Sequence, residues 1–106
     1  MRVHKLEEMK GGWFIGLFEP SLLATKNFEV AVKKYKAGDK EKKHFHKEAI
    51  EFTVILNGTV KMNEVEYFDG DIIEIKKNEA TDFEAISDVT TVVVKTPSIA
   101  NDKYIV

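Results

Sequence analysis

The sequence contains no cysteine, which excludes disulfide bonds, thiolate metal ligands and cysteine nucleophiles. It also lacks an excess of positive charge, because 18 acidic residues face 16 basic ones and the net charge is −2. We therefore expect no nucleic-acid partner. Residues 1–8 hold no apolar signal segment, and the apolar run Trp13–Phe18 is far too short to span a membrane. We expect a soluble cytoplasmic protein that does not bind membranes.

The chain also lacks any long segment with a helical period, any internal repeat and any linker. At 106 residues it can bury one hydrophobic core but not two, so we expect a single domain over residues 1–106. The apolar fraction of 43% and the charged fraction of 32% are typical of a globular chain. Turn signals recur about every 8–12 residues, which is typical of an all-β sandwich or barrel.

Short segments that are β-branched, aromatic or alternating in polarity predict the strands of this fold. They are residues 2–6, 13–18, 28–33, 51–56, 59–62, 65–68, 71–75, 81–86 and 90–95. The segment 13–18 is apolar on both faces, so we expect it to be buried on both sides or to lie at a subunit contact. A small barrel with such a strand favours a homodimer, since two-fold dimers are the commonest oligomers.

The residues that can carry chemistry are concentrated between Gly38 and Gly58. His44 and His46 are two of the three histidines in the chain, and on a strand residues at this spacing point to the same face. Glu51 lies five residues after His46, far enough to belong to the next strand and to point back. Two imidazoles and one carboxylate form a transition-metal ligand set, so we predict a metal site made of these three residues.

The spacing over residues 38–58 also resembles a known motif. It reads Gly, five residues, His-x-His, four residues, Glu, six residues, Gly, and it resembles the first motif of the cupin superfamily at every fixed position. The segment 70–75 resembles the start of the second cupin motif, and the similarity covers roughly residues 28–96. The resemblance implies a small, single-domain, antiparallel and jelly-roll-like β-barrel. It also implies a divalent metal inside the barrel, namely iron, manganese, nickel or zinc.

The second motif, over residues 70–85, is degenerate because Thr81 stands where the family has its third histidine. Three interpretations remain open. Two histidines and Glu51 hold the metal and leave positions for water or substrate. Alternatively, Asp82 supplies the missing ligand, although strand alternation places Thr81 and Phe83 inward and Asp82 outward. In the third, the site has lost its metal and these residues bind an organic ligand or act as acid and base.

Two kinds of function follow from the resemblance. The first is an enzyme with isomerase-type or dioxygenase-type chemistry on a polar small metabolite such as a sugar or sugar phosphate, with Glu51 moving a proton. Substrate contacts would come from Thr81, Phe83 and Tyr35. The second is a non-catalytic binding module or sensor for a carbohydrate or other metabolite. Seven lysines between residues 33 and 47 form either a solvated loop or a basic mouth that attracts an anionic substrate.

Overall fold

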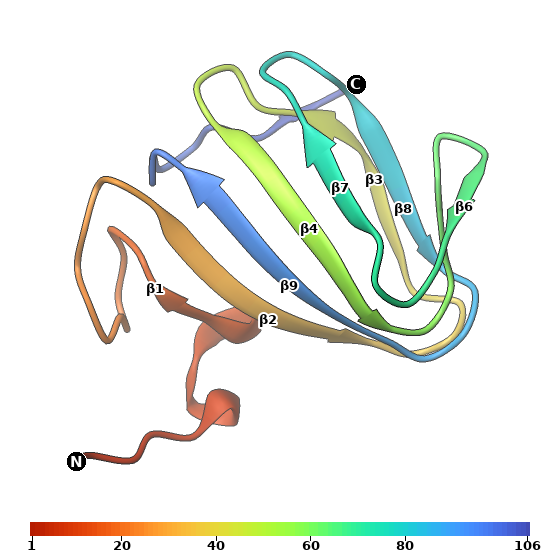
Figure 1. Cartoon of the computed structure of the whole chain (residues 1–106). Helices are drawn as coiled ribbons and strands as arrows, with labels where there is room; N and C mark the ends of the chain where they lie inside the picture. The colour runs from red at the N-terminus through yellow and green to blue at the C-terminus, as the bar shows by residue number, and fades with distance from the viewer.

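The computed structural model describes residues 1–106 and contains ten strands in two antiparallel sheets that face each other (Figure 1). The first sheet has the strand order β1-β2-β9-β4-β7 and the second has the order β10-β3-β8-β5-β6. The strands are β1 Trp13–Ile15, β2 Glu29–Tyr35, β3 Lys40–Phe45, β4 Ile50–Asn57, β5 Val60–Met62, β6 Val65–Tyr67, β7 Ile72–Ile75, β8 Thr81–Ala85, β9 Val89–Thr96 and β10 Tyr104–Ile105. The all-β jelly-roll prediction is therefore confirmed.

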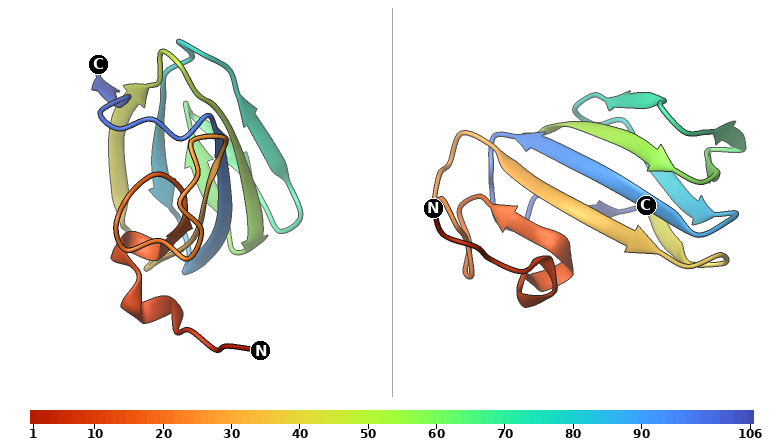
Figure 2. Two further views of the ribbon diagram at one scale, coloured as in Figure 1. Left: turned by 90° about the vertical axis from the view of Figure 1, so that its left-hand side faces the viewer. Right: turned by 60° about the horizontal axis from the view of Figure 1, so that its bottom comes forward.

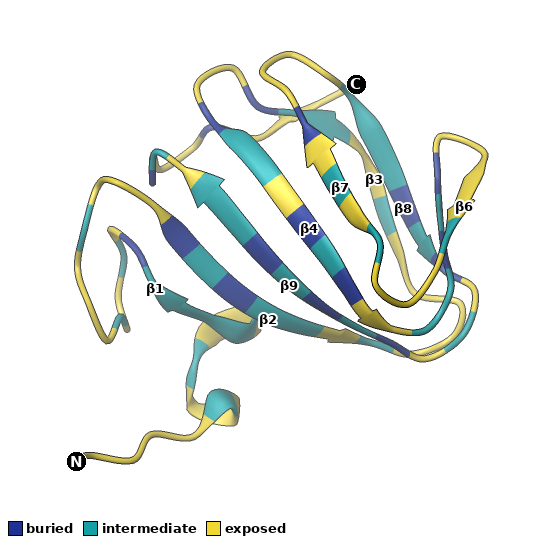
Figure 3. Ribbon diagram, in the orientation of Figure 1, coloured by how far each residue is buried: buried dark blue, intermediate teal, exposed yellow.

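The hydrophobic core fills one end of the space between the sheets. Its buried side chains come from both sheets and are Ile55, Val60, Met62, Ile75, Phe83, Ala85 and Val89. Alternation along β4 explains how one strand serves core and surface at once. Thr53 and Ile55 are buried, whereas Phe52 and Leu56 are exposed (Figure 3). The other end of the same interior is lined mostly by polar and charged residues, and it holds the cavity described below.

The amino-terminal region differs from the sequence prediction. Residues 2–6 form no strand, and two short 3-10 turns, Leu6–Glu8 and Lys10–Gly12, precede β1. Neither turn is a helix long and apolar enough to cross a membrane. The predicted strand 13–18 ends at Ile15, because the chain turns at Gly16 with a φ of +148°. A Cβ at Gly16 would lie 2.2 Å from the Phe18 ring and 2.8 Å from the Glu29 Cβ, so only glycine fits.

The carboxyl-terminal segment packs on its own chain and closes the edge of the second sheet. Strand β10 pairs with β3, with Tyr104 opposite Phe45 and Ile105 opposite His44. The views in Figure 2 show this segment, in dark blue, beside β3. It therefore lies next to the histidine motif, although the two are far apart in the sequence.

The outer face of the first sheet is apolar, with half-buried valines at its centre and exposed residues toward β7. Aligned residues of neighbouring strands form two rows on this face. One row contains Val30, Val94 and Phe52, and the other contains Val32, Val92, Val54 and Ile72. Phe52 is 36% exposed and Ile72 is 67% exposed. Among aligned neighbours only Glu74, at the edge of the first row, is charged.

We propose that the expected homodimer forms through this face rather than through residues 13–18. A neutral apolar face can pack on its own symmetric copy without bringing like charges together, and such faces mark interaction sites. Light scattering after size exclusion should give the dimer mass at micromolar concentration. Phe52→Lys should give a monomer, whereas Ile86→Lys, at an exposed apolar residue of a turn outside the face, should stay dimeric. A monomeric wild type would contradict the proposal.

Candidate functional site

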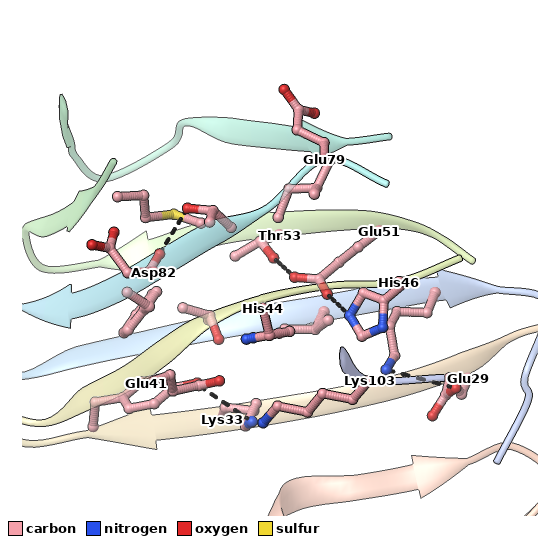
Figure 4. A pocket seen from close by; sticks show the side chains of 18 of the residues that line it. Glu29, Lys33, Glu41, His44, His46, Glu51, Thr53, Glu79, Asp82 and Lys103 are labelled. Carbon is pink, nitrogen blue, oxygen red and sulfur yellow. Dashed lines mark hydrogen bonds and ion pairs between the residues drawn. The ribbon is translucent and has the colours of Figure 1, made fainter. Parts of the chain in front are cut away.

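A cavity of about 220 Å³ lies between the two sheets, at the end opposite the densest part of the core. Both sheets contribute to its wall, and charged side chains point into it from several strands (Figure 4). Glu29, Lys95 and Glu51 form one aligned row across β2, β9 and β4. The cavity is smaller than the 300–1,000 Å³ typical of drug-sized ligand sites, so it fits a small metabolite.

His46 is fixed by the carboxyl-terminal segment. It follows the last residue of β3, and its side chain is buried to 5% exposure. Its Nδ1 lies 2.8 Å from the main-chain carbonyl oxygen of Asp102. A carbonyl can only accept, so Nδ1 carries the hydrogen and Nε2 is turned toward the cavity. The interior histidine therefore presents Nε2 to whatever the cavity binds.

Asp102 also organises the loop that follows His46. Its buried carboxylate accepts hydrogen bonds from the backbone N–H groups of Lys47, Glu48 and Ala49 at 3.0–3.2 Å. These contacts satisfy one buried and two partly buried loop amides with a charged acceptor, which is stronger than a neutral one. One residue thus holds both the His46 ring and the turn that leads into β4.

Glu51 lies beside His46 on the cavity wall. Its Oε1 is 3.5 Å from His46 Nε2, and its Oε2 accepts a 2.7 Å hydrogen bond from the Thr53 hydroxyl. Burial by itself raises the pKa of Glu51, but the contacts with His46 and Thr53 and the charge of Lys95 outweigh it and hold the pKa below its ordinary value. Glu51 is therefore an ionised and mostly buried carboxylate.

His44 is adjacent to this pair. The His44 and His46 ring centroids are 5.3 Å apart, and His44 Nδ1 lies 2.8 Å from the Lys42 carbonyl oxygen. Burial lowers the pKa of His44 and Lys103 lowers it further, although the hydrogen bond with the Lys42 carbonyl raises it. The net lowering of the pKa favours a neutral ring. Its Nε2 is thus left with a free lone pair. A β-irregularity between Glu41 and His44 shifts the register of β3 just before the motif.

The donor chemistry of the three residues fits a divalent transition metal. Both rings hold their hydrogen on Nδ1 by bonding a carbonyl, which is how metal-ligating histidines are usually oriented, and Glu51 supplies the anion. Two ligands each about 2.1 Å from a tetrahedral ion lie about 3.4 Å apart, close to the observed 3.5 Å between His46 and Glu51. In the structure, no three His, Asp or Glu side chains are already close enough together to hold a metal ion. The metal site therefore stays a prediction.

The predicted substrate contacts all line the cavity. The Tyr35 ring packs on Phe83 with centroids 4.5 Å apart, and its hydroxyl donates to Glu41. Burial and the neighbouring Glu41 raise the pKa of Tyr35, so its hydroxyl stays protonated. The Thr81 hydroxyl donates to the Asp82 carbonyl at 2.7 Å, which leaves its oxygen as an acceptor. Phe83 also belongs to the core.

Sequence reasoning missed the charged cavity residues Glu29, Glu41 and Lys95, and it included Lys33 only as one of the lysines of the basic stretch. Lys33 pairs with Glu41 at 3.5 Å, and Lys95 pairs with Glu29 at 3.9 Å. Burial raises the pKa of Glu29 although Lys95 opposes it. For Glu41, the pull of Lys33 and the Tyr35 hydrogen bond outweigh burial and lower the pKa. The alternation of β2 could have placed Glu29 and Lys33 on one face, but no local signal shows that this face is the interior.

Two further expectations concern charge at the cavity. Of the seven lysines between residues 33 and 47, only Lys33 lines the cavity, so the others form no basic mouth around it. Lys103, from the carboxyl-terminal segment, also lines the wall. Asp82 lies on the wall too, but its Oδ1 accepts a 2.7 Å hydrogen bond from the Asn63 N–H, and Figure 4 shows it on the side away from His46.

Comparison with known proteins finds solved structures with the same fold. No protein-family model matches the chain, and a search of curated proteins finds no match. Among solved structures, a Klebsiella pneumoniae conserved protein with a double-stranded β-helix domain is similar with a TM-score of 0.72 and 18% identity, over 98% of this chain and 90% of that one. KdgF from Halomonas sp. is similar with a TM-score of 0.65 and 15% identity, over 73% and 74%.

A third similar structure is a sugar phosphate isomerase of the cupin superfamily from Silicibacter pomeroyi. Its TM-score is 0.62 at 22% identity, over 73% of this chain and 54% of that one. At such identities the similarity establishes the fold and not the activity. The chain therefore has the double-stranded β-helix fold of a small cupin, as the residue 38–58 motif indicates.

The contacts of Asp102 give a stability prediction. Asp102→Ala should lower the free energy of unfolding by on the order of 3 kcal/mol, because it leaves the buried Ala49 N–H unsatisfied and removes the charged acceptor of two partly buried N–H groups. Urea denaturation followed by circular dichroism measures this loss. The control is Asp88→Ala, since Asp88 accepts a single exposed bond from the Ala37 N–H, and its loss should be below about 1 kcal/mol. Equal losses in the two variants would contradict the role given to Asp102.

Proposed function

We propose that the cavity binds a divalent transition metal through His44, His46 and Glu51 and acts on a small polar metabolite. The observation that carries this proposal is the 3.5 Å approach of His46 Nε2 to Glu51 Oε1 in a buried wall. That distance is long for a hydrogen bond, and it matches the separation of two ligand atoms that bind the same metal ion.

The residues around this pair have distinct roles in the proposal. A divalent metal held there would polarise a substrate oxygen as a Lewis acid. Glu51, kept ionised by its neighbours, accepts a proton from a carbon next to a carbonyl, as isomerase-type chemistry requires. Phe83 and Tyr35 form an apolar wall that limits substrate size and excludes water. The fold shared with a sugar phosphate isomerase supports a sugar-like substrate.

A specific observation favours a second candidate function, a metal-free binding module. Thr81 replaces the family's third histidine, and its hydroxyl bonds the Asp82 carbonyl. In this alternative His46 and Glu51 contact each other without a metal, and the cavity holds a carbohydrate or other metabolite without turnover. Metal content distinguishes the two functions directly.

Metal content measured by elemental analysis tests the proposed site. Untagged protein prepared without chelators, or reconstituted with iron, manganese, nickel or zinc, should hold close to one equivalent of metal. Glu51→Ala and the double variant His44→Ala with His46→Ala should lose most of it, because each removes donors that no other residue replaces. Folding of each variant is checked by circular dichroism.

The matched controls are Asp82→Ala and Glu79→Ala, which remove cavity carboxylates outside the proposed ligand set. Figure 4 shows Asp82 away from His46, and the Glu79 carboxylate accepts a hydrogen bond from the Lys76 N–H. Both should keep the metal content of the wild type. Loss of metal in Asp82→Ala would show that Asp82 is the missing ligand. A wild type that takes up none of the four metals would overturn the metal site and favour the binding module.

A further inference from the structure

Thr91 carries a buried hydroxyl that has no hydrogen-bond partner in the protein. The residue lies on β9, is 1% exposed and lines the cavity. Its Oγ1 is the one buried side-chain polar atom without a partner. Leaving a buried hydroxyl unsatisfied costs free energy, whereas valine has nearly the same shape and no polar atom. A group that enters the cavity can satisfy this hydroxyl.

The position of Thr91 relative to Glu51 defines the length of such a ligand. Thr91 aligns with Lys33 on one side and Ile55 on the other, where the cavity meets the core. The row of Thr53 lies between it and the row of Glu51, and the Glu51 carboxylate leans into that middle row to bond Thr53. The remaining span is about 7 Å, two residues of an antiparallel strand.

The charges of the cavity indicate a neutral ligand. Five carboxylates line it, against three lysines: Glu29, Glu41, Glu51, Glu79 and Asp82 against Lys33, Lys95 and Lys103. Lys33 and Lys95 are already paired with Glu41 and Glu29. A bound divalent cation would balance the two excess negative charges and leave none for a phosphate. The exposed Lys103 is too solvated to hold a phosphate firmly by itself.

We infer that Thr91 is a ligand-binding residue that bonds a hydroxyl of a neutral, short-chain polyhydroxy compound, whose other end lies at His46 and Glu51. This inference rests on the proposed function and names its substrate class, an unphosphorylated sugar or polyol. One ligand oxygen satisfies the Thr91 hydroxyl at the cavity floor. The Tyr35–Phe83 wall packs against the carbon chain.

The first test is the thermal stability of ligand-free Thr91→Val. Removing the hydroxyl while keeping the shape should change Tm by no more than about 2 °C, because the hydroxyl has no partner in the protein to lose and water in the open cavity can bond it. Thr90→Val, the neighbouring residue on the outer face of the same strand, should leave Tm within about 1 °C. A fall of more than about 4 °C in Thr91→Val would show that the hydroxyl is bonded within the protein and would overturn the inference.

The second test measures ligand binding to zinc-loaded protein by saturation-transfer NMR. Erythritol and xylitol should bind the wild type and Thr90→Val equally, and Thr91→Val about fivefold more weakly, the value of one hydrogen bond. Glycerol 3-phosphate should bind no more tightly than glycerol. Equal polyol binding by Thr91→Val and the wild type, absence of polyol binding, or a strong preference for the phosphate would each overturn the inference.

Zinc content is determined on the same samples and separates the two proposals. Thr91 is not one of the proposed metal ligands, so Thr91→Val should hold as much zinc as the wild type. If the wild type takes up neither zinc nor iron, manganese or nickel, the proposed function fails. If zinc binds normally and the Thr91 substitution leaves polyol binding unchanged, only the Thr91 inference fails.

Discussion

The bonds that Asp102 makes with the histidine loop are the contacts on which the site depends. The carbonyl of Asp102 orients the His46 ring through a hydrogen bond. The Asp102 carboxylate accepts hydrogen bonds from three successive loop amides. Strand β10 then pairs with β3 and keeps Asp102 in place. Without this anchor the buried Ala49 N–H would face no acceptor, and the His46 ring beside Glu51 would lose the carbonyl that orients it.

The interior is divided into an apolar and a polar half by the same strands. On β4, β8 and β9 the inward positions change from aliphatic or aromatic residues to threonine and charged residues along the strand, as from Ile55 to Glu51. Ion pairs and hydrogen bonds satisfy nearly all the polar groups, which is the condition for keeping them buried. Thr91 stands at the boundary and is the exception.

Local patterns were enough to predict most of the strands and the grouping of His46 with Glu51, but they wrongly predicted a strand at residues 2–6 and missed β10. Turn residues such as Asn57 and Gly58 delimit the strands, and a two-residue period places Glu51, Thr53 and Ile55 on one face. Contacts between distant segments left no local signal. The pairing of Glu29 with Lys95 depends on the register of β2 and β9, and the role of Asp102 depends on where β10 returns.

Strand β2 is inverted relative to its own hydrophobicity. It buries Glu29 and Ala31, and it turns Val30 and Val32 outward. If the pairing of β2 with β9 shifted by one residue, Val30 and Val32 would face the interior and Glu29 would face outward. That arrangement would fit the hydrophobicity of the strand better, so the neighbouring strands must determine the register of β2. In the order of folding events, β2 is therefore expected to join after β4, β9 and the core cluster have formed. Substitutions in β2 should then accelerate unfolding more than they slow folding.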